Sequence, residues 1–174
     1  YHVGNLAEQL LSSARIMLEE VGVAKLSMRA LCSALGVTAT AAYHHFTKRA
    51  ELLAQLATQG YLELAEELNE KAVALPVEEK IRGFCLIYLN FARRNPALYQ
   101  LMFGPELEFE QMPEHLLNAR QFAFSRLELM VADLLKQTPD RPDVRSAALA
   151  SWSYIHGLTS LLLHEVLQRP AAMS

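Results

Sequence analysis

Apolar residues recur at every third or fourth position along most of the chain, and no stretch alternates apolar and polar residues as a half-buried strand would. In the first 50 residues the apolar pattern breaks at Gly22 and at Gly36. Gly36 suits the left-handed backbone conformation that often ends a helix. Ser27 and Thr38 stand where side-chain oxygens cap helix N-termini. We therefore predict three short helices, over residues 5–21, 28–34 and 39–46.

Longer helical runs follow, which are interrupted or separated by Gly60, Pro76, Asn95-Pro96 and Gly104-Pro105. The chain is thus expected to be all-α with about nine helices. A helix-turn-helix module of three helices would occupy residues 1–48, and a helical bundle residues 49–174. The later helices are predicted over residues 49 to about 73, 78–94, 97–103, about 114–136 and about 143–168.

The second and third predicted helices have the spacing of a helix-turn-helix motif. Cys32 is a small residue four positions before Gly36, and such a pair lets two helices cross closely. In these motifs the second helix enters the major groove of DNA. The same spacing also fits a three-helix packing unit without a ligand, so the pattern alone leaves both interpretations open.

The distribution of charge favours DNA binding. The chain carries a net charge of −3, yet residues 21–50 contain four basic residues and no Asp or Glu. This segment is locally +4, and the charges of the remaining residues therefore sum to −7. One small basic surface on an acidic body fits local contact with phosphates and argues against unspecific binding of polyanions.

The stretch SMRALCSALGVTATAAYHHFTKRAELL, at residues 27–53, resembles the DNA-binding module of TetR-type bacterial repressors. YHVGNL at the start, NPALYQLMFG at 95–104 and WSYIHGL at 152–158 resemble the TetR subgroup whose C-terminal domain is named for a Trp-His-Gly signature. The resemblance implies a homodimeric bacterial transcription regulator that joins through its last two helices. Its partners would be a near-palindromic operator in double-stranded DNA and a small hydrophobic or amphipathic effector.

The resemblance also implies roles for single residues. Ser27 and Thr38 would contact phosphates as well as cap helices, Tyr43 would donate a hydrogen bond to a phosphate, and Thr40 and His44 would face base edges. Taken with the basic residues of this segment, the candidate DNA-binding residues are Ser27, Arg29, Thr38, Ala39, Thr40, Tyr43, His44, Lys48 and Arg49.

The start of the fourth helix departs from the family pattern. Lys48 occupies a position that usually holds a capping Ser, Asn or Asp, and Ala50 replaces a common acidic residue. Arg49 stands where the family usually has Lys. We therefore expect this helix to be weakly capped and Lys48 to contact phosphate.

Adjacent His44 and His45 diverge by about 100° on a helix and have no third ligand at helical spacing, so we expect no metal and no cofactor. His45 is expected to pack toward the fourth helix. No nucleophile with a base, carboxylate pair or phosphate-binding glycine loop has recognisable spacing, so we expect no enzyme. The main alternative to a DNA-binding regulator is a helical interaction module without DNA-binding activity.

Aromatic and apolar residues in the second half either line an effector pocket or fill the core, and core packing is the commoner use of such stripes. Trp152 and His156 share one helix face, and Gly157 would let another helix approach closely. These three residues could either contact a ligand or form a structural cluster, and the sequence leaves both interpretations open. The candidate pocket residues are Tyr88, Phe91, Tyr99, Met102, Phe103, Phe122, Trp152 and His156.

The last two predicted helices carry broad apolar faces. These faces fit either a four-helix interface between two chains or the core of a single chain. The residues concerned are Leu116, Ala123, Leu127, Met130 and Leu134 on one helix, and Val144, Ala148, Ile155, Thr159, Leu162 and Val166 on the next.

Nothing in the pattern predicts a membrane or secreted protein. No apolar run reaches the roughly 20 residues of a membrane span, and no leader precedes the first helix. The two cysteines make no disulfide framework. We therefore expect a cytoplasmic protein.

Overall fold

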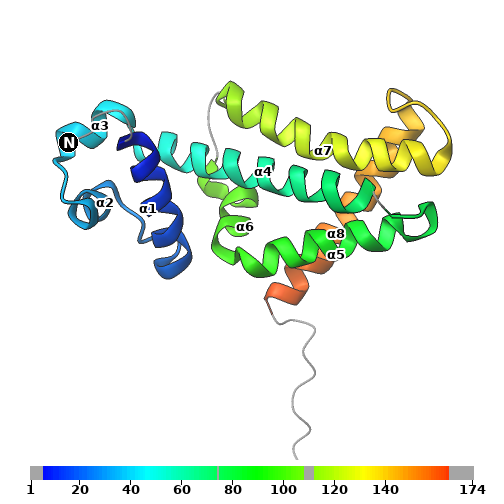
Figure 1. Cartoon of the computed structure of the whole chain (residues 1–174), viewed down its shortest axis with the longest axis horizontal. Coiled ribbons are helices and arrows are strands. Elements are labelled where there is room, and N and C mark those ends of the chain that lie inside the picture. The colour runs from blue at the N-terminus through cyan, green and yellow to red at the C-terminus, as the bar shows by residue number, and fades with distance from the viewer. Residues whose placement is uncertain (1–5, 74, 108–111, 165–174) are drawn as a thin grey trace, which may run out of the picture. The chain divides into compact units, whose positions relative to one another are not determined.

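The computed structural model describes residues 6–73, 75–107 and 112–164 (Figure 1). Within these ranges the chain forms eight α-helices, one 3-10 helix and no strand, which confirms the all-α class. The predicted end of the last helix near residue 168 lies outside the described residues. The elements are α1 (Leu6–Val21), α2 (Met28–Leu35), α3 (Ala39–His45), α4 (Arg49–Val73), α5 (Val77–Arg94), α6 (Pro96–Phe103), η2 (Pro105–Leu107), α7 (Glu114–Leu135) and α8 (Pro142–Leu163).

Contacts between residues divide the chain into two compact units, whose boundaries fall inside α4 and α7. Unit 1 comprises the residues up to Tyr61 together with Asn95–Arg120. Unit 2 comprises Leu62–Arg94 and the residues from Gln121 onward. The predicted division into a helix-turn-helix module, residues 1–48, and a helical bundle, residues 49–174, concerns function and not compactness. It stays a prediction.

The short helices of unit 1 end where the glycine pattern predicts. Gly22 follows α1 with φ 76°, and Gly36 follows α2 with φ 65°, a left-handed conformation that costs glycine least. Leu10, Ala14 and Leu18 form one stripe of α1 that is completely buried. This spacing of four residues fixes which side of α1 faces the core.

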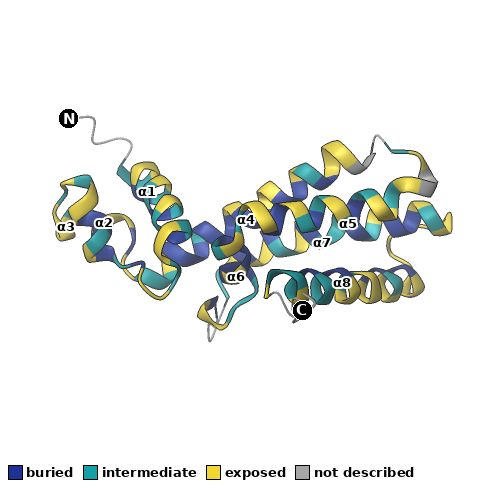
Figure 2. Cartoon of the chain, turned by 90° about the horizontal axis from the view of Figure 1, so that it is seen from below, coloured by how far each residue is buried: buried dark blue, intermediate teal, exposed yellow. Residues whose placement is uncertain are grey.

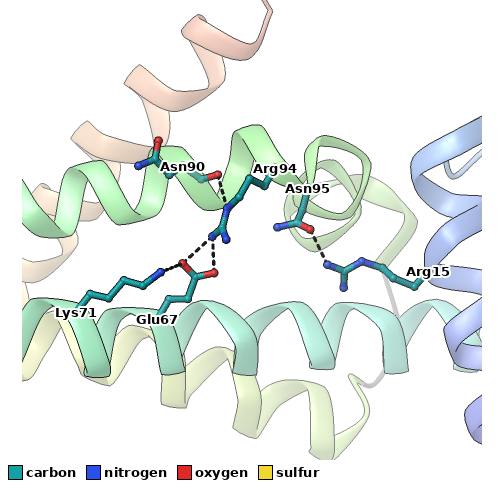
Figure 3. Close-up of polar contacts among 6 residues, drawn as sticks. All are labelled: Arg15, Glu67, Lys71, Asn90, Arg94 and Asn95. Carbon is teal, nitrogen blue, oxygen red and sulfur yellow. Dashed lines mark hydrogen bonds and ion pairs between the residues drawn. The ribbon is translucent and has the colours of Figure 1, made fainter.

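Helix α6 is held in unit 1 by polar contacts at its N-terminal end. The Glu19 carboxylate on α1 accepts hydrogen bonds from the backbone N–H groups of Ala97 and Leu98, each at 3.0 Å. These amides belong to the first turn of α6, where a negative charge also complements the helix dipole. Beside them, Arg15 Nη2 donates to Asn95 Oδ1 at 2.8 Å (Figure 3).

Helix α4 runs through Gly60 without a break, as the predicted helix over residues 49 to about 73 requires, although its apolar pattern is interrupted at this glycine. A Cβ at Gly60 would lie 2.7 Å from Met102 Sδ and 2.8 Å from a methyl group of Leu98. The glycine therefore lets α4 and α6 pack closely within unit 1. At the next residue, the buried Tyr61 hydroxyl donates to the Met102 carbonyl at 2.6 Å, and burial raises the pKa of Tyr61 to about 12.

Unit 2 contains a charged cluster between α4 and α5. Arg94 Nη2 donates to both carboxylate oxygens of Glu67, at 2.5 and 2.7 Å, and Lys71 Nζ lies 3.0 Å from one of them (Figure 3). Partial burial raises the pKa of Glu67, but the bonds from Arg94 and Lys71 outweigh it and leave the pKa below its ordinary value.

The described residues contain no helix with both the length and the apolar composition that a membrane span requires.

Candidate nucleic-acid interface

Side-chain caps fix the N-terminal ends of α2 and α3. Ser27 Oγ accepts a hydrogen bond from the Ala30 amide, and Thr38 Oγ1 accepts one from the Ala41 amide, both at 3.2 Å. Both predicted caps are thereby confirmed. Because each hydroxyl accepts in its cap, its own O–H can still donate to an acceptor outside the chain, as a phosphate contact requires.

Helix α3 turns its candidate residues to the outside of unit 1. Ala42 is completely buried and fixes the inner face of the helix, whereas Tyr43 keeps 47% of its surface exposed. A shallow hollow borders the helix at this side. Exposed residues that line it are Thr38, Ala39, Thr40, Tyr43, His44 and His45.

His45 lies differently from the expectation. It is exposed, and its ring stands edge-on to that of His44 with the centroids 5.8 Å apart. Phe46, which is 6% exposed, lies inward just where α3 ends. Ala42 and Phe46, four residues apart, form the buried side of this segment, and the hollow is lined by both His44 and His45.

The basic residues near α3 have two different roles. Arg29 and Lys48 are exposed, as is Lys25, which the sequence pattern identified only through its charge. Arg49 is half-buried, and its guanidinium donates to the backbone carbonyls of Leu26, at 2.8 Å, and Val23. These bonds tie the start of α4 to the turn before α2, which gives Arg49 a structural task inside unit 1.

The start of α4 is better capped than Lys48 and Ala50 predicted. The Glu51 carboxylate accepts hydrogen bonds from the Thr47 amide at 2.7 Å and the Thr47 hydroxyl at 2.9 Å. The bond from the Thr47 hydroxyl is the largest of the causes that hold the pKa of Glu51 below its ordinary value. Glu51 thus takes the place of the acidic residue that the family commonly has at the position of Ala50.

Helix α3 presents hydroxyl and imidazole groups on its exposed side. Among the described residues no group of three or more His, Cys, Asp or Glu side chains is placed to hold a metal ion. Thr40 and His44 are one helical turn apart, so their hydroxyl and imidazole groups can reach neighbouring base edges or phosphates.

The eight candidate pocket residues are distributed over both compact units, and their role in effector binding stays a prediction. Tyr99, Met102 and Phe103 belong to unit 1, and the other five belong to unit 2. Tyr88, Phe91, Tyr99 and Met102 are at most 3% exposed, as core residues are. Phe122 is 43% exposed.

Trp152 and His156 form a structural cluster with Tyr88. Trp152 Nε1 donates to the Tyr88 hydroxyl at 3.2 Å, and that hydroxyl lies 3.1 Å from His156 Nδ1. Tyr88 therefore links α5 to α8, and partial burial holds the pKa of His156 below its ordinary value. No heavy atom of the described residues lies within 4 Å of a Cβ placed on Gly157, so no close approach of another helix requires this glycine within the described chain.

A cavity of about 320 Å³ lies elsewhere in unit 2, between α4, α5 and α7, and none of the eight predicted residues lines it. Its basic side chains are Lys80 and Arg126. The sequence did not predict this cavity because the candidate residues were chosen mainly as aromatic side chains. The distinctive groups of the cavity are instead cationic side chains on apolar helix faces.

The apolar faces of α7 and α8 mainly bury the core of one chain. Leu116, Leu127, Val144 and Ile155 are at most 2% exposed. These four residues therefore fit the alternative of a core within one chain, a dimer through the last two helices stays a prediction, and Val166 lies outside the described residues. Figure 2 shows a long exposed side on α8, and its apolar members are Leu149, Ala150, Tyr154 and Leu161.

Family comparison agrees with this architecture. Residues 10–56 match the family of bacterial regulatory proteins named tetR, and residues 81–173, more than half of the chain, match the tetracyclin repressor-like C-terminal domain. The chain therefore belongs to the tetR family. It is a DNA-binding transcription regulator and, like its family, not an enzyme.

Individual relatives support the assignment. The nucleoid occlusion factor SlmA of Vibrio vulnificus strain YJ016 is 30% identical over 143 residues, which cover 76% of this chain and 68% of that protein. A solved structure of a protein of unknown function from Rhodococcus sp. RHA1 has a TM-score of 0.81 and 28% identity, covering 98% of this chain and 89% of that one. The TetR family regulator PfmR from Thermus thermophilus shares the fold, with a TM-score of 0.66 at 20% identity over 95% of this chain and 88% of that one.

Proposed function

We propose that the protein is a homodimeric repressor that acts in the cytoplasm. Two copies of α3 bind successive major grooves of a near-palindromic operator, and a small hydrophobic or amphipathic effector in the C-terminal bundle releases them. The observation that carries the proposal is the exposed side of α3, where Thr40, Tyr43 and His44 face outward in a segment without any acid. Family membership and the two free thiols agree with it.

Contacts to phosphate position this surface on DNA. Arg29 and Lys48 supply charge, Thr38 and Ser27 supply hydroxyl donors, and Tyr43 supplies a phenol. Arg49 contributes indirectly, because its bonds to the turn before α2 keep the start of α4 in place.

Specificity rests on few base contacts. The exposed face of α3 offers Thr40 and His44 but no Arg or Asn for bidentate recognition of guanine or adenine. The Ala39 methyl group can contact a thymine methyl group. Shape and deformability of the operator therefore contribute to its recognition.

The dimer forms through the exposed side of α8. Ala150, Ser153 and Gly157 succeed one another at helical spacing, and Leu161 continues the row. Nothing in the described chain explains the glycine at position 157, whereas a second copy of α8 crossing there would. The Trp152, His156 and Tyr88 cluster on the inner side of α8 fits the subgroup with the Trp-His-Gly signature.

DNA binding is tested by selecting bound duplexes from random DNA and titrating the selected site with salt. An inverted repeat is expected, with a log–log slope that is clearly negative. Lys48→Gln should reduce the magnitude of the slope by about 1.8, because the dimer loses one phosphate contact from each subunit. Arg82→Gln on α5 removes the same charge from an exposed site in unit 2, outside the helix-turn-helix, and should leave the slope unchanged. A slope near zero for the parent protein would favour a helical interaction module without DNA-binding activity.

The dimer is tested by introducing one charge at position 157. A Cβ at position 157 has no heavy atom of the described chain within 4 Å, so Gly157→Glu should leave each subunit folded while light scattering reports a monomer. Ile81→Glu, at a residue that is 56% exposed on α5, is the matched control and should remain dimeric. A monomeric parent protein at micromolar concentration would contradict the proposal of a two-fold operator.

A further inference from the structure

The cavity in unit 2 combines an apolar wall with an excess of positive charge. Leu68 and Phe84 are at most 4% exposed, and Met130 is 9% exposed. They line the cavity from α4, α5 and α7. A wall of this kind favours a hydrocarbon or aromatic body over water.

One cation at the cavity has a nitrogen without a partner. Arg126 Nε is buried and donates no hydrogen bond to any of the described residues. Its Nη2 donates to Ser125 Oγ at 3.2 Å, and Nη1 lies 3.5 Å from Asn69 Oδ1, the outer limit of a hydrogen bond. No carboxylate of the described residues forms an ion pair with Arg126, although a guanidinium can bind a carboxylate through two parallel N–H groups.

The position of Arg126 is fixed by an aromatic ring. Its guanidinium carbon lies 4.4 Å above the ring centroid of Phe122, one helical turn earlier on α7. This stacking orients the planar group in advance, so less conformational entropy is lost when an anion binds. Phe122 thus supports the cavity without lining it.

The second cation at the cavity is already neutralised. Lys80 Nζ lies 2.5 Å from Asp133 Oδ2, and both residues line the cavity. The lining therefore has one positive charge in excess, which is that of Arg126. Charge and shape together favour an anion with a single charge and an apolar body.

We propose that this cavity binds an amphipathic monocarboxylate, whose carboxylate pairs with Arg126 and whose apolar body lies against Leu68, Phe84 and Met130. This inference rests on the proposed function, since it gives the chemical class of the effector. The cavity volume of about 320 Å³ accommodates a medium-chain or single-ring acid and lies at the lower end of the range for small-molecule sites.

The binding test uses calorimetry without DNA, so its outcome does not depend on the regulator function. Octanoate is the probe, and 1-octanol and octylamine have the same chain with a neutral or cationic head group. Octanoate should bind about 10- to 100-fold more tightly than octanol, as one charge-assisted contact predicts. Equal binding of all three, tighter binding of octylamine, or no binding of octanoate would each overturn the proposal.

Two substitutions in the lining test the role of charge. Arg126→Gln should lose the preference for octanoate over octanol, whereas Arg82→Gln, which removes a charge from an exposed site on α5, should keep it. Asp133→Asn frees Lys80 and should tighten octanoate binding, which gives a test even if Arg126→Gln fails to fold. Unchanged octanoate affinity in Arg126→Gln, or weaker affinity in Asp133→Asn, would overturn the assignment.

A second arm separates the cavity from its regulatory role. Octanoate at saturating concentration is added to the complex with the selected operator, and release is followed by fluorescence anisotropy. Binding to the free protein together with release from DNA supports an effector site. Binding without release overturns its role as effector while leaving the DNA-binding function intact, and absence of any DNA binding concerns the proposed function alone.

Discussion

Two parts of the molecule place a histidine beside an aromatic residue, and they use it in opposite ways. On α3, His44 follows Tyr43 and both are exposed. On α8, His156 lies one turn after Trp152, and the two side chains meet the Tyr88 hydroxyl. The residue types are alike, but Trp152 and His156 on α8 contact a residue of the same chain, Tyr88.

The comparison teaches that the location of the partner distinguishes a binding residue from a structural one. Trp152 Nε1 and His156 Nδ1 share the hydroxyl of a buried tyrosine, so these two residues contribute to the stability of unit 2. The Tyr43 side chain is 47% exposed, so its phenol can form a hydrogen bond with a group of another molecule. Substitutions should therefore affect stability at one place and DNA affinity at the other.

The largest effect is expected from Trp152→Ala. It removes a large half-buried side chain and leaves the Tyr88 hydroxyl without its donor, so the free energy of unfolding should fall by about 3 kcal/mol. Urea denaturation at one fixed protein concentration measures it, because the proposed dimer would make stability concentration-dependent. Tyr43→Ala is the control and should change the value by less than about 0.5 kcal/mol. Equal losses in both variants would remove the distinction between the two parts.

A matched pair of Tyr→Phe substitutions gives a smaller and sharper effect. Tyr88→Phe leaves Trp152 Nε1 and His156 Nδ1 without their shared partner and should cost about 1 to 2 kcal/mol of unfolding free energy, with DNA affinity retained. Tyr43→Phe should leave stability unchanged and weaken operator binding by about 0.5 to 1.5 kcal/mol. Anisotropy titrations at matched salt measure the second quantity. If Tyr43→Phe binds as tightly as the parent, its phenol does not contact phosphate.

The smallest effect concerns pH. Burial holds the folded-state pKa of His156 below its ordinary value of 6.5, because protonation is less favourable in the fold than in the unfolded chain. The contribution of His156 to the free energy of unfolding is therefore complete above pH 6.5. It declines as the pH falls from 6.5 toward the folded-state pKa of His156. Urea midpoints at about pH 7.5 and 5.5 should show less of this decline in His156→Gln than in the parent. His44→Gln should retain the decline in full, and an identical decline in all three proteins would show that His156 is not its source.

Local sequence signals predicted much of unit 1. Gly22 and Gly36 end helices because their left-handed backbone conformation strains other residues, and Ser27 and Thr38 cap because their hydroxyl groups reach amides three residues on. Such signals act within a few residues, so the sequence contains them in full. The exposed side of α3 follows from the same short-range pattern.

Long-range pairing was not predictable in this way. The bond between Arg49 and the Leu26 carbonyl joins residues 23 positions apart, and the one between Trp152 and Tyr88 joins residues 64 positions apart. Periodicity shows that a helix has an apolar face but not which element covers it. For this reason the apolar faces of α7 and α8 were compatible with a dimer interface or a core, and burial decided for the core.

The sequence by itself determined the all-α class, the helix-turn-helix spacing and the acid-free basic segment, because propensity, capping and charge are properties of neighbouring residues. Only the tertiary structure decided that His45 is exposed, that Arg49 holds a turn, and that Arg126 faces a cavity with an unpartnered nitrogen. These outcomes depend on which helices meet, and packing between distant segments is set by the whole chain at once.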